Sequence, residues 1–406
     1  MEASKSETRK TRAVVAGGGV AALEAVIALR SLAGYLADVT MLSPEREFVY
    51  QPLSVGDPFA LGPAKRYPLA KVAEELQLEL LHDGLESVDA GAHTVRTSSG
   101  EELGYDALLV AVGAGREPAF DDVLTFRGQE DGERAHGLIQ DLEGGYVRRI
   151  AFVVPPGISW ALPLYELALM TANRARDMSL TDVELTIVTP EESPLIVFGT
   201  HASEQMRELV AAAGISIETN AHAVVEHANE VRIVPGDRRI ECDRIVALPR
   251  IVGRRIDGLP SDDDGFISID EHTRVPSVDG VYAAGDGTTF PVKQGGIACQ
   301  QADTAAAEIA RAAGADVPSE PFRPVLRGQL LTGSAPRFMR HQLTGGQGED
   351  SEVSDHTLWW PPSKIAGVHL APFLGELPET EQVRDAPDEV PLDVPPTERA
   401  GTRIWI

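Results

Sequence analysis

The segment from Ala13 to Glu24 constrains the fold of this chain more than any other part of it. It reads Ala-Val-Val-Ala-Gly-Gly-Gly-Val-Ala-Ala-Leu-Glu, a β-branched run followed by three glycines and the start of a helix. Its small residues match the dinucleotide-binding turn, in which they permit a tight bend, close backbone approach to a pyrophosphate, and close packing of helix on strand. The alternative is a glycine-rich turn without a ligand. We expect a pyrophosphate to lie against Gly17, Gly18, Gly19, Val20, Ala21 and Ala22.

The unit that begins with this turn occurs twice. Ser43-Pro-Glu45 ends one strand, and the similar Thr189-Pro-Glu191 ends another. A strand, a helix and a second strand make each copy, at 14–16, 20–32 and 39–42, then at 149–154, 162–174 and 183–188. Because such βαβ units form parallel sheets, the sequence predicts an α/β protein with two Rossmann-like, three-layer ββα dinucleotide-binding domains. The alternative is a chance similarity of two strand ends.

The length of 406 residues also favours more than one domain. After each βαβ unit the pattern continues with a helix, meander strands and one returning strand, and residues 266–313 return to the first domain. The second domain is therefore inserted in the first. We expect the first domain at 11–120 and 261–316, the second at 146–260, a C-terminal cap or interface segment at 317–375, and an acidic, proline-rich, disordered tail at 376–406.

The charge balance excludes some partners. The chain has 36 Lys and Arg against 62 Asp and Glu, a net charge of −26, whereas nucleic-acid binding needs clustered cations. Its two cysteines, Cys242 and Cys299, cannot build a disulfide framework. The sequence has no signal peptide, no apolar run of about 18 residues and no metal-ligand cluster. We expect a cytoplasmic protein that binds neither nucleic acid nor a metal.

A second motif indicates which dinucleotide is bound. Val281-Tyr-Ala-Ala-Gly-Asp286 reads as a short strand that ends at a carboxylate, and a helix is expected from Gly295 to Ile309. The carboxylate accepts a hydrogen bond from a ribityl hydroxyl, and the helix N-terminus favours negative charge on a reduced flavin. Lys293 either adds to this charge or is a solvated surface lysine. The cofactor is therefore predicted to be FAD, bound at this end by Gly285, Asp286, Lys293, Gln294 and Gly295.

Other segments are expected to complete the FAD site. Either Glu45 or Ser43 holds the ribose at the end of the second strand, and the geometry of such folds favours the acid. The loop at 48–53 is expected to line the flavin, or else to be a half-buried turn. The strand at 105–112 ends in small residues, which permit close approach of a cofactor. These segments and the meander add Gln51, Pro52, Val88, Ala111, Val112 and Gly113.

Together these segments make the chain resemble the pyridine nucleotide-disulfide oxidoreductase superfamily. Its branch of sulfide:quinone oxidoreductases, flavocytochrome c sulfide dehydrogenases and type-II NADH dehydrogenases is most similar, through Ser43–Leu53 and Lys293–Ala302. The resemblance covers residues 11–313. It implies bound FAD, two Rossmann-like domains, a C-terminal segment that approaches a membrane or partner, and often a homodimer.

The sequence departs from this family at both electron-donor routes. The second domain reads Val154-Pro-Pro-Gly-Ile-Ser-Trp160 where a glycine-rich turn is expected, and prolines lack the N–H donors that a pyrophosphate needs. The sulfide-oxidising members carry a redox cysteine about where Trp160 stands. Cys242 and Cys299 do not fit a catalytic pair and are expected to be small buried hydrophobes. NAD(P)H binding is therefore doubtful, and a disulfide relay is not expected.

Three functions follow from this pattern. The first is an FAD-dependent oxidoreductase that passes electrons from NAD(P)H or another small reductant to a quinone-like acceptor. The second is a non-catalytic flavin-binding sensor or partner subunit, and the third is a dehydrogenase with nicotinamide in the first domain. For the first, residues 358–374 form either a peripheral contact with the inner face of a membrane or a cap over the FAD domain. The sequence assigns no catalytic residue.

Overall fold

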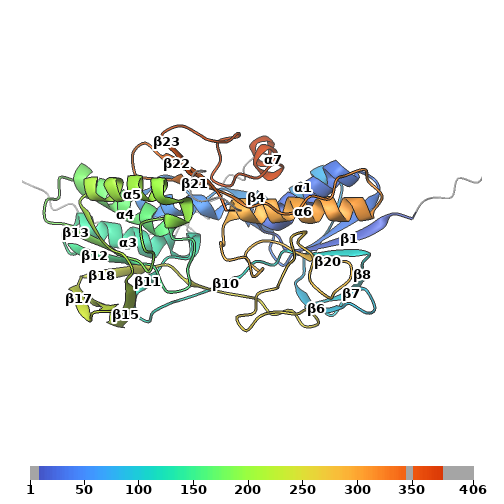
Figure 1. Cartoon of the computed structure of the whole chain (residues 1–406), viewed down its shortest axis with the longest axis horizontal. Coiled ribbons are helices and arrows are strands. Elements are labelled where there is room, and N and C mark those ends of the chain that lie inside the picture. Colours follow the sequence, from blue (N-terminus) through green and yellow to red (C-terminus); the bar gives the residue numbers. More distant parts are fainter. Residues whose placement is uncertain (1–8, 344–350, 378–406) are drawn as a thin grey trace, which may run out of the picture.

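The computed structural model describes residues 9–343 and 351–377. One half of the molecule is built on a five-stranded parallel sheet (Figure 1). Its strands are, in order, β20 (Val281–Ala283), β9 (Ala107–Val110), β1 (Thr11–Ala16), β2 (Ala37–Leu42) and β5 (Glu79–Leu81). The central strands are buried on both faces, which explains their continuous apolar sequences.

Helices and a meander cover the two faces of this sheet. The helices are α1 (Val20–Ala33), α2 (Leu69–Leu76) and α6 (Gly295–Ala312), and they share one core with the sheet. The meander consists of β6 (Leu85–Asp89), β7 (Thr94–Thr97) and β8 (Glu102–Gly104), whose apolar residues share a second core on the opposite face. This arrangement is the predicted three-layer ββα fold.

The other half repeats this architecture. Its parallel sheet has the order β11 (Leu124–Thr125), β18 (Arg244–Ala247), β12 (Arg149–Val153), β13 (Glu184–Val188) and β14 (Ile215–Glu218). Its helices are α3 (Gly132–Glu143), α4 (Leu162–Asp177) and α5 (Thr200–Ala212), and its meander is β15 (His222–His227), β16 (Glu230–Val234) and β17 (Arg238–Glu241). Four strands have the same order in both halves, β9-β1-β2-β5 and β18-β12-β13-β14, which confirms two Rossmann-like halves. The outer strands differ, since β20 follows its neighbours in the sequence whereas β11 precedes them.

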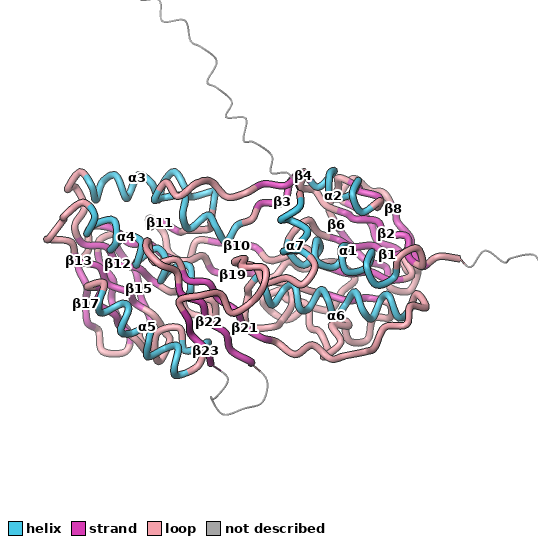
Figure 2. The backbone as a smooth tube through the Cα atoms, turned by 90° about the horizontal axis from the view of Figure 1, so that it is seen from above, coloured by secondary structure: helices cyan, strands magenta, loops and turns pink. Residues whose placement is uncertain are grey.

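Two strands connect the halves. β10 (Gly115–Glu117) pairs antiparallel with β19 (Arg250–Val252) midway between the sheets (Figure 2). Helix α3 follows β11 in a segment that the sequence analysis left between the domains. Its buried residues Ala135, Leu138, Ile139 and Leu142 do have helical spacing, although glycines at both ends of the helix obscured this signal.

Short elements complete the cover of the first half. β3 (Glu47–Val49) pairs with β4 (Arg66–Pro68), and a 3-10 helix, η1 (Gln51–Phe59), follows β3. Two further 3-10 turns are η2 (Gln129–Asp131) and η3 (Ile196–Phe198).

The C-terminal segment makes a third, smaller sheet and a helix. β21 (Val325–Leu330), β22 (Arg337–Gln342) and β23 (Ser351–Ser354) are antiparallel, and α7 (Leu370–Glu376) lies beside α1 (Figure 2). The predicted tail at 376–406 falls, apart from its first two residues, outside the described residues. Within the described ranges, every helix is too short or too polar to cross a membrane.

Candidate active site

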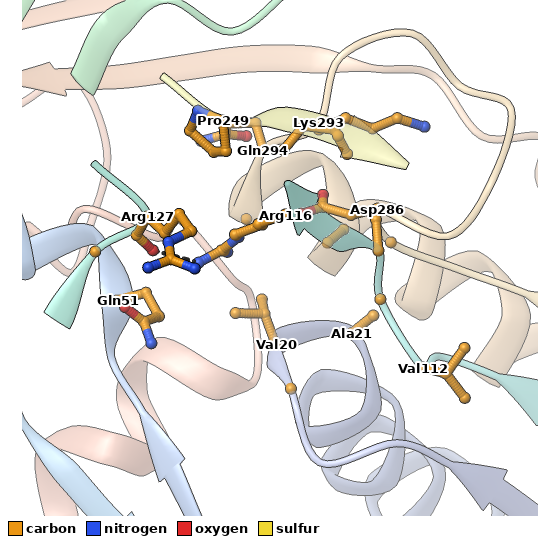
Figure 3. A pocket seen from close by; sticks show the side chains of 18 of the residues that line it. Val20, Ala21, Gln51, Val112, Arg116, Arg127, Pro249, Asp286, Lys293 and Gln294 are labelled. Carbon is orange, nitrogen blue, oxygen red and sulfur yellow. Dashed lines mark hydrogen bonds between the residues drawn. The ribbon is translucent and has the colours of Figure 1, made fainter. Parts of the chain in front are cut away.

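A cavity of about 1730 Å³ lies between the two halves of the molecule. The glycine turn after β1 forms one part of its wall, and Asp286, after β20, forms another (Figure 3). These two motifs are far apart in the sequence, but β9 places β1 and β20 in one sheet with their carboxyl ends at the same edge. Open α/β sheets bind their ligands at this edge.

The glycine turn is shaped for close approach of a ligand at one residue. Gly17 has a φ of +142°, and a Cβ there would lie 2.2 Å from the carbonyl oxygen of Ala111. A Cβ on Gly18 would lie 2.3 Å from Ser43 Oγ. A Cβ on Gly19 would meet no described atom within 4 Å. The first two glycines are therefore required by the protein itself, whereas Gly19 leaves open space toward the cavity.

The start of α1 offers free hydrogen-bond donors beside that space. Gly19 is the N-cap residue, and no side chain among the described residues caps the helix there. The first N–H groups of a helix lack intrahelical partners and carry partial positive charge, which makes them an anion site. Val20 and Ala21 line the cavity at this point, whereas Ala22 is fully buried against the strand. This turn fits a pyrophosphate.

Ser43 and Glu45, at the end of β2, differ in whether their side chains are free to bind a ligand. Ser43 is fully buried, and its hydroxyl accepts a hydrogen bond from the N–H of Glu45 at 3.2 Å. Glu45 is exposed and lines the cavity. This geometry favours Glu45 over Ser43 as the partner of ribose hydroxyls.

The loop after β3 and the end of β9 form the middle of the cavity. Gln51 and Pro52 line it at the start of η1, and Ala111, Val112 and Gly113 line it after β9. Val88 does not reach it, since its side chain belongs to the core under the meander and its N–H donates to the carbonyl of Asp257. The structure therefore brings all but two of the predicted site residues, Ala22 and Val88, to the wall of one cavity.

Charged groups gather at the Asp286 end. Burial raises the pKa of Asp286, and the positive charges of Arg116 and Lys293 oppose this shift. Lys293 donates to the carbonyl of Thr288 and lies 3.9 Å from the centroid of the Phe266 ring, and burial lowers its pKa to about 8. Arg116 reaches across the cavity to the carbonyl of Arg127 at 2.9 Å (Figure 3). Lys293 is thus a tethered, half-buried lysine rather than a freely solvated one.

The predicted helix after Asp286 begins at Gly295 and has a cap of its own. Gln294 accepts a hydrogen bond from the N–H of Ile297 at 2.9 Å, and its amide donates to the carbonyl of Arg327. Gly295 is packed against Ile365, to which an added Cβ would come within 3.0 Å. Both residues line the cavity, and their packing holds the helix N-terminus toward it.

The sequence analysis missed a buried ion pair in the cavity wall. Lys364 Nζ lies 2.7 Å from Glu166 Oε2, and both side chains are almost fully buried. Lys364 also donates to the carbonyl of Pro52, and Glu166 accepts from the N–H of Leu331. The signal was present but weak, because each is an isolated charge in an apolar segment and 198 residues separate them.

The fold and the cavity define a class of protein, a dinucleotide-binding flavoprotein with two Rossmann-like halves. The chain belongs to the pyridine nucleotide-disulphide oxidoreductase family, whose sequence model matches residues 11–308. It is an FAD-dependent oxidoreductase, and this membership sets aside a dehydrogenase with nicotinamide in the first domain.

Individual relatives agree with this assignment. A sulfide-quinone reductase of Aquifex aeolicus (strain VF5) is 28% identical over 187 residues, which are 44% of this chain and 43% of that protein. The matched segment thus spans less than half the length of this relative. The crystal structure of the sulfide:quinone oxidoreductase from Aquifex aeolicus superimposes with a TM-score of 0.76 and 19% identity, over 85% of this chain and 86% of that one.

More distant structures share the fold. NDH2 from Plasmodium falciparum in complex with NADH has a TM-score of 0.64 and 13% identity, over 84% of this chain and 92% of that chain. A NAD-dependent persulfide reductase from A. fulgidus has a TM-score of 0.58 and 18% identity, over 81% of this chain and 64% of that chain.

Proposed function

We propose that this protein passes electrons from a small reductant through FAD to a quinone-like acceptor, without a redox-active disulfide. The observation that supports this most is the Lys364–Glu166 pair in the wall of the cavity that fits FAD. Reduction of a quinone to a hydroquinone consumes two electrons and two protons. FAD, when bound, would supply the two electrons and one of the protons, because it accepts a hydride, so the protein must supply one further proton.

In this proposal the ion pair supplies a proton from two side chains that are almost fully buried in the cavity wall. Burial raises the pKa of Glu166 and lowers the pKa of Lys364, so the affinities of the two groups for a proton approach each other. A proton shared over 2.7 Å between Nζ and Oε2 is then available at little cost. The carbonyl of Pro52 and the N–H of Leu331 orient the two groups.

The cysteines do not support a thiol relay. Cys242 lies in the core of the second half and Cys299 in the core of the first, and both are buried. Burial raises the pKa of Cys242 to about 11 and that of Cys299 well above its usual range. Because the thiolate is the reactive form, neither cysteine has the properties of a redox nucleophile.

The segment 358–374 has exposed apolar side chains that could contact a membrane, from which a lipid-soluble acceptor would enter. Ile365, Leu370 and Leu374 are buried against the first half, as a cap would be. Trp360 is 86% exposed and Val368 is 69% exposed. We propose that these two side chains reach the inner face of a membrane, where a lipid-soluble quinone enters, while the rest of the segment covers the flavin. A homodimer belongs to the same proposal, and sedimentation of the purified protein tests it.

Two half-reactions test the proposed function. Protein purified with FAD is mixed anaerobically with candidate donors, and the bleaching of the flavin band near about 450 nm is followed. The reduced protein is then mixed with a water-soluble quinone, and recovery of the band is measured. We expect at least one small reductant to bleach the flavin and the quinone to restore it. If no donor bleaches the flavin faster than buffer does, the alternative of a non-catalytic flavin-binding subunit is favoured.

A further inference from the structure

The second half of the molecule has a place equivalent to the FAD site, and its own side chains fill it. In the first half the cavity passes over the turn after β1 and reaches Glu45 after β2. The equivalent ends are those of β12 and β13, because β18-β12-β13-β14 are arranged like β9-β1-β2-β5. Among the described residues that line the cavity, 156–160 follow β12, but none comes from the segment 189–199 after β13.

The acid after β13 is turned inward. The N–H of Glu191 donates to Thr189 Oγ1 at 3.2 Å, as the N–H of Glu45 donates to Ser43 Oγ at 3.2 Å. The turns match, but the carboxylates differ. Glu191 accepts hydrogen bonds from the hydroxyl of Tyr165 at 2.8 Å and from Thr189 Oγ1 at 2.9 Å. The Tyr165 ring, on α4, is fully buried. The carboxylate that would bind ribose hydroxyls therefore already accepts hydrogen bonds from Tyr165 and Thr189.

Aromatic side chains pack over the rest of the carboxyl end of the second sheet. Phe198, at the end of η3, is fully buried and packs on Trp160, which stands just before α4, with 5.6 Å between ring centroids. Phe198 also lies tightly under β21, since a Cβ on Gly328 would come within 2.4 Å of its ring. Ser351, at the start of β23, donates to the carbonyl of Phe198. The C-terminal sheet thus packs on η3, which follows β13, and on α4 and α5.

We propose that Tyr165, Glu191 and Phe198 determine donor specificity by closing the second half to nicotinamide dinucleotides. Pro155 and Pro156 strengthen this exclusion, since they remove backbone donors from the turn. The donor is then a small reductant without a nucleotide, which binds in the cavity that residues 156–160 line. This inference rests on the proposed function. It restricts the class of electron donor to small reductants that contain no nucleotide.

The test uses protein purified with FAD and NADH as the probe. Hydrogen exchange of residues 154–160 and 189–199 is measured with and without millimolar NADH, and anaerobic bleaching of the flavin by NADH is followed. We expect exchange to be unchanged and NADH to bleach no faster than buffer. Protection of these residues by NADH, or rapid bleaching, overturns the proposal. Failure of every donor to bleach the flavin contradicts the proposed function instead, so the two failures are distinct.

Two variants test whether Tyr165 and Phe198 occupy the carboxyl end of the second sheet in solution. Phe198→Ala removes the contact with β21, and we expect exchange in β21 and β22 to rise by roughly tenfold or more while the flavin spectrum is kept. Tyr165→Phe removes the hydroxyl that donates to Glu191, and we expect it to raise hydrogen exchange in residues 189–199. If Phe198→Ala does not fold, Tyr165→Phe is the test variant. Tyr146→Ala, at an aromatic residue of the same half that is 83% exposed, is the control. Unchanged exchange in both variants overturns the proposal.

Discussion

At the scale of single residues, the glycines of the first turn are required for different reasons. Gly17 is held at a left-handed φ against Ala111, whereas Gly19 faces open space at the start of α1. We predict that Gly19→Ala folds normally but binds FAD at least about tenfold more weakly, because a methyl group occupies the approach of the pyrophosphate. Titration of the protein with FAD, followed by quenching of flavin fluorescence, measures this.

Two neighbouring substitutions complete that experiment. Gly17→Ala should prevent folding, because the added Cβ overlaps a backbone carbonyl. Gly137→Ala, inside α3 where a Cβ would meet nothing within 4 Å, should leave FAD affinity unchanged. If Gly19→Ala binds FAD as tightly as the Gly137 variant, the pyrophosphate does not lie over this turn.

The buried ion pair allows a prediction at the same scale. Glu166→Gln should slow reoxidation of the flavin by a quinone by about 10²-fold and leave bleaching by the donor unchanged, because it removes a proton donor on the acceptor side only. The pH profile of reoxidation should flatten as well, which a purely structural role would not cause. Stopped-flow absorbance separates the two half-reactions, and equal slowing of both would contradict the assignment.

Stability gives an independent check on the pair. Lys364→Met leaves Glu166 buried without its cation and should cost about 3–5 kcal/mol of unfolding free energy. The double variant Lys364→Met/Glu166→Gln should cost less than the single Lys364 variant, because no uncompensated charge remains. Urea denaturation of the native protein, both single variants and the double variant completes the cycle, and additive losses would show that the two residues do not interact.

At the scale of elements, α7 is held to α1 by a cluster of acids. Glu24 accepts hydrogen bonds from the N–H groups of His369 and Leu370, and Asp303 on α6 lies against Glu24. Burial, and then the charge of Glu24, raise the pKa of Asp303 to about 8. This carboxyl therefore keeps a proton in the folded protein at neutral pH.

The sign of the resulting pH dependence follows directly. Between about pH 4 and pH 8 the unfolded chain releases the Asp303 proton while the folded chain keeps it, so unfolding free energy falls as pH rises. Asp303→Asn should flatten stability across this window and raise it at pH 8 relative to the native protein. Denaturation monitored by circular dichroism from pH 5 to pH 8 measures it, and an unaltered slope in the variant would refute the explanation.

At the scale of the whole molecule, the proposed FAD site joins two segments that are far apart in the sequence. The turn at 17–19 and Asp286 belong to the first half, and both line the cavity between the two halves. Because a ligand stabilises the state that binds it, free FAD at about 1,000 times its dissociation constant should add roughly 4 kcal/mol. Removal of FAD should therefore increase hydrogen exchange in β1 and β20 far more than in β12. Equal increases in both sheets would contradict a cofactor held by the first half.

Most of the fold was predictable because its signals are local. The βαβ units depend on β-branched strands, helical periodicity and a glycine turn within about 30 residues, and these features act at short range. Thus the helix expected at 20–32 is α1 (Val20–Ala33), and the strand expected at 183–188 is β13 (Glu184–Val188). The three-stranded sheet β21–β23 was not predicted, since its strands are stabilised by packing on the second half rather than by a strong pattern of their own.

The candidate site likewise has features that the sequence predicts and contacts that only the tertiary structure makes. The glycine turn, Asp286 and the absence of a second glycine turn were readable from the chain, because each depends on the backbone freedom or charge of adjacent residues. Only the coordinates join Lys364 to Glu166, Tyr165 to Glu191, or Glu24 to the start of α7. These contacts link separate elements, one pair 198 residues apart. Sequence pattern encodes which elements form, whereas long-range packing decides which side chains meet and whether a site stays open or is filled.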